Sequence, residues 1–278
     1  MYPWLRLSSL GLRQDRLFLR SNKALEDSNG DSELAKQWLR EQGSVYADKR
    51  NQRSTSQGQI CLKVTNNAQT AFLVELNCET DFVAKTDLFK QGSKTLLETL
   101  ETCDNFASDF ESSKSDSVKQ EFMKFQLTKP LDDDLTSMTV EEALTYLIAK
   151  TRENCNIGQV LYMNLDQNKR FGSYMHNKSD DYMGKMGALV VVGSEKDTNV
   201  TNIADAIAMH ITAMKPTYLS KSDIPSGVKV NENDILEHQE LISKDNEDNL
   251  IVKDYIEKKS EELDTKITIE DYIIFSCS

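Results

Sequence analysis

Residues 59–85, QICLKVTNNAQTAFLVELNCETDFVAK, contain the pattern that decides the fold. Apolar residues alternate with other residues in QICLKV and again in AFLVELNC, which is the period-two pattern of β-strands. The stretch between them, TNNAQT, is rich in residues that favour turns. The sequence therefore predicts an antiparallel hairpin. The inward side chains of its second strand are Phe72, Val74, Leu76 and Cys78.

Helical patterns follow the hairpin. Residues 86–103 have apolar side chains at helical spacing behind a cap at Thr86 or Asp87, and this predicts a helix. Thr139 and Glu142 form a capping-box pair at the start of a further helix. The inward positions of the first of these helices are Phe89, Leu96, Leu97 and Leu100.

The second half of the chain repeats these kinds of element. GQVLYMNLD (158–166) and FGSYMHN (171–177) predict two strands joined by a polar turn. GALVVVGS (187–194) is a short apolar run that predicts a buried central strand. NIADAIAMHITAMK (202–215) predicts a helix, and IEDYIIFSC (269–277) predicts a final strand. The inward stripe of that helix consists of Ile203, Ile207, Ile211 and Met214.

These elements predict an α+β fold with two units in tandem, each a small antiparallel sheet covered by helices on one side. We expect the first unit to span residues 57–155 and the second to span residues 156–278. Residues 22–56 predict a pair of short helices followed by a polar linker. Such a helix pair is too small to fold alone, so it must pack on something else.

The first 21 residues differ from the rest of the chain. Residues 1–20 contain four arginines and one aspartate, a local charge of +3 in a chain whose net charge is -12. An amphipathic, arginine-rich and acid-poor leader is typical of a mitochondrial presequence. We therefore expect residues 1–21 to direct the protein to the mitochondrial matrix. The alternative is an ordinary N-terminal helix with a basic face.

Composition limits the partners and the chemistry. A net charge of -12 repels nucleic acid phosphates, so we expect no direct nucleic-acid binding. No apolar run approaches the ~18 residues of a membrane-spanning helix. The cysteines are odd in number and include no CxxC, which favours reduced thiols and argues against a structural zinc site. They are Cys61, Cys78, Cys103, Cys155 and Cys277.

The residues capable of catalysis form no recognisable motif. Cys78 and His210 could form a nucleophile pair, but each lies in an apolar pattern that favours a buried structural role. No glycine-rich phosphate loop is present. We therefore expect no catalytic site and no cofactor. The histidines, His176, His210 and His238, fall on a predicted strand, a helix and a loop-like segment.

Three acidic residues around the end of the second strand could suggest a metal site or an acid–base pair. These are Glu75, Glu79 and Asp81. Glu75 projects to the strand face opposite Cys78, and no second acidic cluster pairs with it. We therefore favour a solvated rim and expect no metal.

Phe82 admits two interpretations. The strand pattern stops at Cys78, and a turn that includes Thr80 and Asp81 would orient Phe82 away from the inward column of the strand. Large aromatic residues are mostly buried, so composition and pattern favour a core position for Phe82. The alternative is an exposed anchor for the pocket of a partner.

VELNCETDFVAK (74–85) resembles the signature of elongation factor Ts, the guanine-nucleotide exchange factor of elongation factor Tu. Residues 22–43 resemble the end of that family's small N-terminal UBA-like helical domain. The first helix of that domain has no counterpart in the sequence, so either the domain is incomplete or the N-terminal segment is divergent or misassigned. The chain passes from Pro225 almost directly to Leu236, as in the mitochondrial type. The resemblance covers residues 22–278. Other matching segments are GKMGALVVV (184–192), IADAIAMHITAMKP (203–216) and ITIEDYIIFSC (267–277).

The resemblance implies a role in translation elongation rather than an enzymatic activity. In this family the Asp-Phe pair, here Asp81 and Phe82, presses between two helices of the GTPase domain of elongation factor Tu, near GDP and its magnesium ion. Those helices would shift, and GDP would leave. The resemblance thus implies mitochondrial elongation factor Tu as the partner, bound through Thr80, Asp81, Phe82 and Val83.

Two other classes of function stay open. The helix pair at residues 22–43 could be the recognition module of a protein-binding adaptor. Cys78 could be the nucleophile of a thiol-dependent hydrolase. An assay of GDP release from elongation factor Tu separates these alternatives from nucleotide exchange.

Overall fold

The computed structural model describes residues 27–29, 31, 53–103, 106–131, 137–243 and 249–277. The expected presequence and most of the expected helix pair lie outside the described residues, so both stay predictions. Among the described residues, no helix is long and apolar enough to cross a membrane.

The first sheet contains the predicted hairpin. β1 (Gln57–Thr65) and β2 (Thr70–Cys78) pair in antiparallel register along their whole length, so this prediction is confirmed. Asn and Ala residues at 66–68 all have positive φ in the turn between them. β3 (Cys155–Asn164) pairs with the other edge of β2, and β5 (Met183–Gly184) pairs with β1. The strand order is therefore β3-β2-β1-β5.

Helices cover one face of this sheet. α3 (Asp81–Ala84) and α4 (Asp87–Leu100) follow β2, whereas α5 (Asp116–Met123) and α6 (Val140–Thr151) precede β3. A short 3-10 helix lies at Ser112–Lys114. The inward positions predicted for β2 and for α4 are all buried in one cluster, as expected: Phe72, Val74, Leu76, Cys78, Phe89, Leu96, Leu97 and Leu100.

The predicted capping box at the start of α6 is confirmed. Thr139 Oγ1 accepts a hydrogen bond from the Glu142 backbone N–H at 3.2 Å, and Glu142 Oε2 accepts one from the Thr139 N–H at 2.8 Å. The substitution Thr139→Ala removes one of these bonds and is expected to lower the free energy of unfolding by about 1 kcal/mol, measured by urea denaturation. Thr145→Ala on the same helix is the control, with an expected change below about 0.5 kcal/mol. Equal losses would contradict a capping role.

The second sheet contains β4 (Lys169–His176), β6 (Met186–Ser194) and β7 (Ile267–Ser276) in the order β4-β6-β7. As predicted, the apolar run at 187–194 forms the buried central strand. α7 (Thr201–Met214) and α8 (Val252–Glu262) pack on this sheet. Short 3-10 helices lie at Lys221–Asp223, Glu232–Asp234 and Leu236–His238.

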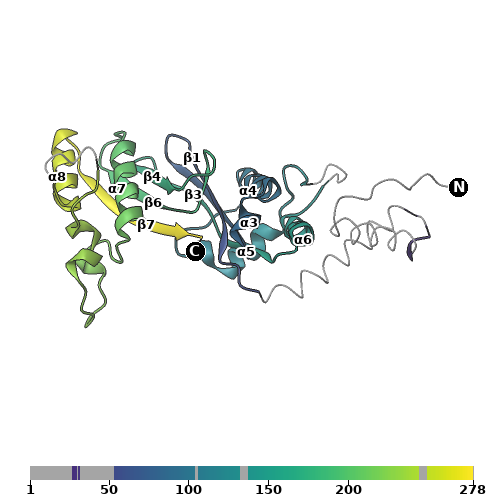
Figure 1. The fold of residues 1–278 in the computed structure, drawn as a ribbon. Coiled ribbons are helices and arrows are strands. Elements are labelled where there is room, and N and C mark those ends of the chain that lie inside the picture. The colour runs from purple at the N-terminus through teal and green to yellow at the C-terminus, as the bar shows by residue number, and fades with distance from the viewer. Residues whose placement is uncertain are drawn as a thin grey trace.

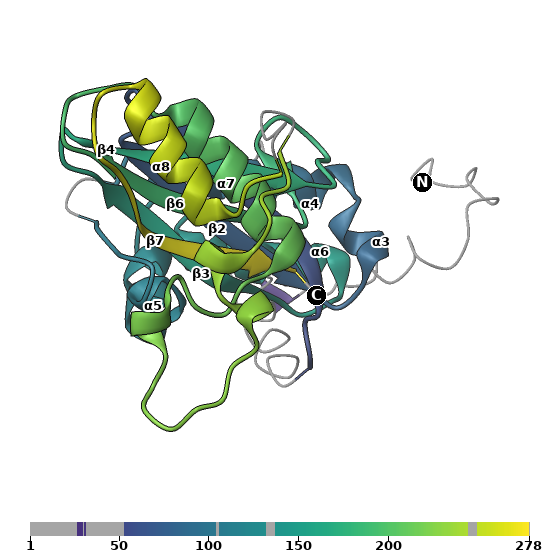
Figure 2. The ribbon, with the colours of Figure 1, turned by 90° about the vertical axis from the view of Figure 1, so that its left-hand side faces the viewer.

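The two sheets pack face to face through a shared apolar cluster. The first sheet contributes Ile60, Leu62, Ala71, Leu73 and Leu161, and the second contributes Phe171, Met175, Leu189, Val191 and Phe275. The fold therefore has four layers, with helices outside each sheet (Figures 1 and 2). β2 is consequently buried on both faces, although its alternating pattern predicts only one buried face.

The predicted strands at residues 158–166 and 171–177 both form and are joined by a polar turn, but they belong to different sheets. β3 pairs with β2 in the first sheet, whereas β4 pairs with β6 in the second. The change of sheet thus falls after Asn164 and not at the expected division between residues 155 and 156. A polar turn indicates where a strand ends, but not which strand becomes its neighbour.

One position of the α7 stripe differs from the prediction. Ile203, Ile207 and Ile211 are buried as expected, but Met214 is 43% exposed. Met214 is the last residue of α7, and Lys215 then takes a left-handed conformation that ends the helix. The apolar stripe of α7 therefore extends to Met214, beyond the part of the helix that packs against the core.

Candidate functional site

The TDFV segment forms a single helical turn between β2 and α4. Thr80 has extended backbone geometry and caps α3, and its Oγ1 accepts a hydrogen bond from the Val83 N–H at 3.4 Å. Thr86 then caps α4, so α3 ends after one turn. The helical pattern thus begins earlier than the sequence predicts, at Asp81. We call residues 79–85 the Phe82 turn.

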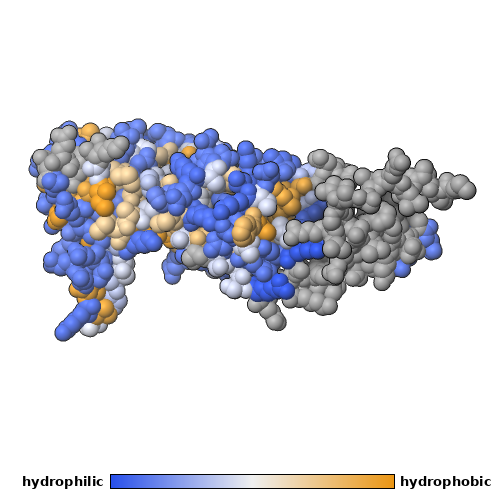
Figure 3. Space-filling view, in the orientation of Figure 1, coloured by the Kyte–Doolittle hydropathy of each residue, from blue (hydrophilic) through white to orange (hydrophobic). Residues whose placement is uncertain are grey.

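The Phe82 turn places Phe82 in solvent. Among the described residues, Phe82 is the most exposed large apolar side chain, at 80%. Ala84 is buried and Val83 packs against the core, so these two residues fill the inward positions of the turn. The pattern-based prediction of a core position for Phe82 is therefore wrong. The face of the molecule in Figure 3 is mainly hydrophilic, with small separate apolar patches.

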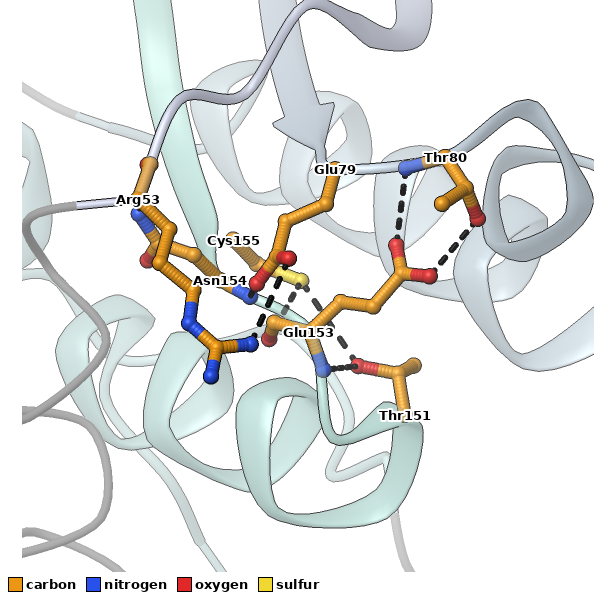
Figure 4. Close-up of polar contacts among 7 residues, drawn as sticks. All are labelled: Arg53, Glu79, Thr80, Thr151, Glu153, Asn154 and Cys155. Atoms are coloured by element: carbon orange, nitrogen blue, oxygen red, sulfur yellow. Dashed lines mark hydrogen bonds and ion pairs between the residues drawn. The ribbon is translucent and has the colours of Figure 1, made fainter.

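Two carboxylates hold the start of the turn against the connection between α6 and β3 (Figure 4). Glu153 accepts hydrogen bonds from the Thr80 N–H at 2.9 Å and from the Thr80 hydroxyl at 2.6 Å. Glu79 Oε1 accepts one from the Asn154 N–H at 2.7 Å, while its Oε2 lies 3.5 Å from the Arg53 guanidinium. Each segment therefore supplies a carboxylate to a backbone N–H of the other.

Further hydrogen bonds hold the end of the turn. Gln59 on β1 donates from Nε2 to the Ala84 carbonyl at 3.1 Å, in a buried position. Ser179 in turn donates to Gln59 Oε1 at 3.0 Å. At the start of the turn, the Cys78 thiol donates to the Thr80 carbonyl at 3.2 Å. The turn is thus held at both ends, and Phe82 projects from a fixed base.

The sequence does not indicate the residues that support the turn. Glu153 and Asn154 lie more than 70 residues from their partners along the chain, and no local spacing connects them. The pairing of β2 with β3, which ends at Cys78 and Cys155, brings the two segments together. A correct prediction that β3 pairs with β2 would have placed them side by side.

The predicted acidic rim is only partly correct. Asp81 is partly exposed and pairs with Lys85 at 2.7 Å, and this hydrogen bond lowers the pKa of the Asp81 carboxyl. Glu75 is instead half-buried, with its carboxylate beside Gly158, and this burial raises its pKa. Glu79 accepts the hydrogen bond from the Asn154 N–H that is described above. The three carboxylates therefore have separate roles, and the described residues contain no group of three His, Cys, Asp or Glu side chains placed to hold a metal.

The candidate nucleophile pair does not come together as a site. Burial raises the pKa of the Cys78 thiol to about 12, so this thiol stays protonated at neutral pH. His210 is fully buried, bonds Gln239 Oε1 through Nε2 at 2.9 Å and accepts from the Ile242 N–H at 3.1 Å. All five cysteines are buried. The prediction that Cys78 and His210 are core residues is confirmed.

An exposed aromatic side chain on a firmly held turn is typical of surfaces that contact another protein. The family model for elongation factor Ts matches residues 79–269, more than half of the chain, and this match includes the Phe82 turn. The chain is 29% identical over 253 residues to an elongation factor Ts of Baumannia cicadellinicola, covering 91% of this chain and 77% of that protein. It is 30% identical to one from Nostoc, covering 90% and 79%.

A third relative, an elongation factor Ts of Hamiltonella defensa, is 31% identical, and here the match covers 60% of that protein. These comparisons place the chain among the translation elongation factors. Within that class, the chain belongs to the elongation factor Ts family.

Proposed function

We propose that the protein binds elongation factor Tu carrying GDP and promotes release of the nucleotide. The observation that carries this proposal is Phe82, which is 80% exposed on a turn held by hydrogen bonds at both ends. A large apolar side chain in solvent costs free energy in the unbound protein, and a crevice on a partner removes that cost. Thr80, Asp81, Phe82 and Val83 form the proposed contact.

The proposed mechanism is a coupling between two binding events. Phe82 would enter an apolar crevice near the nucleotide of the GTPase and displace the groups that hold GDP and its magnesium ion. Coupling free energies are reciprocal, so tighter binding of this protein requires looser binding of GDP. No covalent bond changes in this process, and the turn needs only a fixed shape and an exposed aromatic side chain.

A nucleotide-release assay tests the proposal. Elongation factor Tu loaded with fluorescently labelled GDP is mixed with excess unlabelled GDP, with and without this protein, and the loss of signal is followed in time. We expect release to accelerate with increasing concentration of the protein and then to saturate. Binding without acceleration would favour the adaptor alternative, and absence of both would contradict the proposal.

We also propose that the protein acts in mitochondria as a partner of mitochondrial elongation factor Tu. The support is the arginine-rich, acid-poor composition of residues 1–20 and the short connection between Pro225 and Leu236. Mass spectrometry of the protein from isolated mitochondria should find a mature N-terminus downstream of the leader. Recovery of the intact chain from the cytosolic fraction alone would contradict this localisation.

A further inference from the structure

We propose that Glu153 is a positioning residue that completes the cap of α3 from a distant part of the chain and so sets the direction of Phe82. This inference rests on the proposed function, because it concerns how the Phe82 turn is held ready for its partner. It identifies a contribution of the α6–β3 connection, which lies outside the TDFV motif.

The cap of α6 shows what a complete capping box contains. Its Thr139 hydroxyl accepts from the N–H three residues later, and the Glu142 carboxylate accepts from the Thr139 N–H. α3 has the first bond, from the Val83 N–H to Thr80 Oγ1. Its residue at the glutamate position is Val83, which has no acceptor and packs against the core.

Glu153 supplies the missing acceptor. Its Oε2 accepts from the Thr80 N–H at 2.9 Å, the same bond that Glu142 makes to Thr139 within α6. Its Oε1 also accepts from the Thr80 hydroxyl at 2.6 Å, which orients that hydroxyl so that its lone pairs face α3. The Thr80 N–H thus has the same kind of acceptor as the Thr139 N–H, while Val83 stays apolar and packs against the core.

α3 depends on these external bonds because a helix of four residues is unstable alone. The reciprocal bond from the Asn154 N–H to Glu79 fixes the same two segments together, and Thr151 Oγ1 accepts from the Glu153 N–H at 3.3 Å. Figure 4 shows both carboxylates lying between the two segments. Loss of Glu153 would therefore release the start of the turn while β2, α6 and the core stay packed.

The test compares Glu153→Ala with Glu142→Ala, which removes the equivalent acceptor from the capping box of α6. We expect Glu153→Ala to slow GDP release at saturating concentration by about tenfold or more, because both charge-assisted bonds to Thr80 are lost. Glu142→Ala should leave that rate unchanged. Glu153→Gln, which keeps one oxygen acceptor, should fall between Glu153→Ala and the unchanged protein. Equal rates for Glu153→Ala and Glu142→Ala would overturn the inference.

Amide hydrogen exchange of the free protein provides a readout that does not depend on elongation factor Tu. We expect Glu153→Ala to increase exchange in the peptide covering residues 79–88, and Glu142→Ala to leave that peptide unchanged. Unchanged exchange in Glu153→Ala would overturn the inference even if nucleotide release is stimulated. Conversely, increased exchange without any stimulated release in the unmodified protein would contradict only the proposed function.

Discussion

Phe82→Ala is expected to reduce stimulated GDP release by about 30- to 1,000-fold, since truncation of a central aromatic contact typically costs about 2–4 kcal/mol. Phe82 is 80% exposed, so the substitution removes little packing from the free protein. We therefore expect the free energy of unfolding to change by less than about 0.5 kcal/mol. The release assay and urea denaturation of the same preparation measure the two effects together.

Leu263→Ala is a suitable control for this substitution. Leu263 is also exposed and follows α8, which lies at the other end of the layered fold from α3 (Figure 1). It should leave both nucleotide release and stability unchanged. A Phe82→Ala protein that unfolds would support the core interpretation instead. One that is folded and fully active would show that the exposed aromatic ring does not act on the partner.

Gly172→Ala is expected to give the largest loss of stability, about 3 kcal/mol, at the upper end of the typical cost of overpacking. A Cβ atom at Gly172 on β4 would overlap the backbone carbonyl group of Ala204 on α7. Backbone atoms inside a helix cannot move away as a flexible side chain can, so α7 must shift from the second sheet. For a chain of this size, the melting temperature should fall by about 6–12 °C.

Gly227→Ala provides the matched glycine control. A Cβ at Gly227 would meet no atom within 4 Å, although the φ of 87° is unfavourable for alanine. Its cost should therefore stay near the 1–2 kcal/mol of a left-handed residue. A Gly172→Ala protein that is no less stable than Gly227→Ala would contradict the close approach of α7 to β4.

Local features of this fold could be predicted from the sequence. The turn residues at 66–68, the Thr139–Glu142 capping box and the apolar stripe of α4 all act within a few residues, so their spacing identifies them. The central strand at 187–194 was also predictable, because a continuous apolar run needs cover on both faces. These features define the elements, but not how the elements associate.

Features that depend on distant residues were not predictable. β3 directly precedes β4 in the chain, yet it pairs with β2, which lies before the four helices of the first unit. For the same reason the pattern assigns Phe82 to the core, since it does not show that Val83 and Ala84 already occupy the inward positions. The resemblance to a known family identified the turn, but the support from Glu153 follows only from the three-dimensional arrangement.

The alternation of the chain between the two sheets affects how the protein can fold during synthesis. β1, β2 and β3 can pair once residue 164 has left the ribosome, but the face formed by Ile60, Leu73 and Leu161 still lacks its cover. That cover includes Phe275 on β7, which is translated last among the described strands. β4 and β6 can cover this surface earlier, but the nascent chain exposes the part that Phe275 covers until synthesis is nearly finished, a condition that favours aggregation and binding by chaperones.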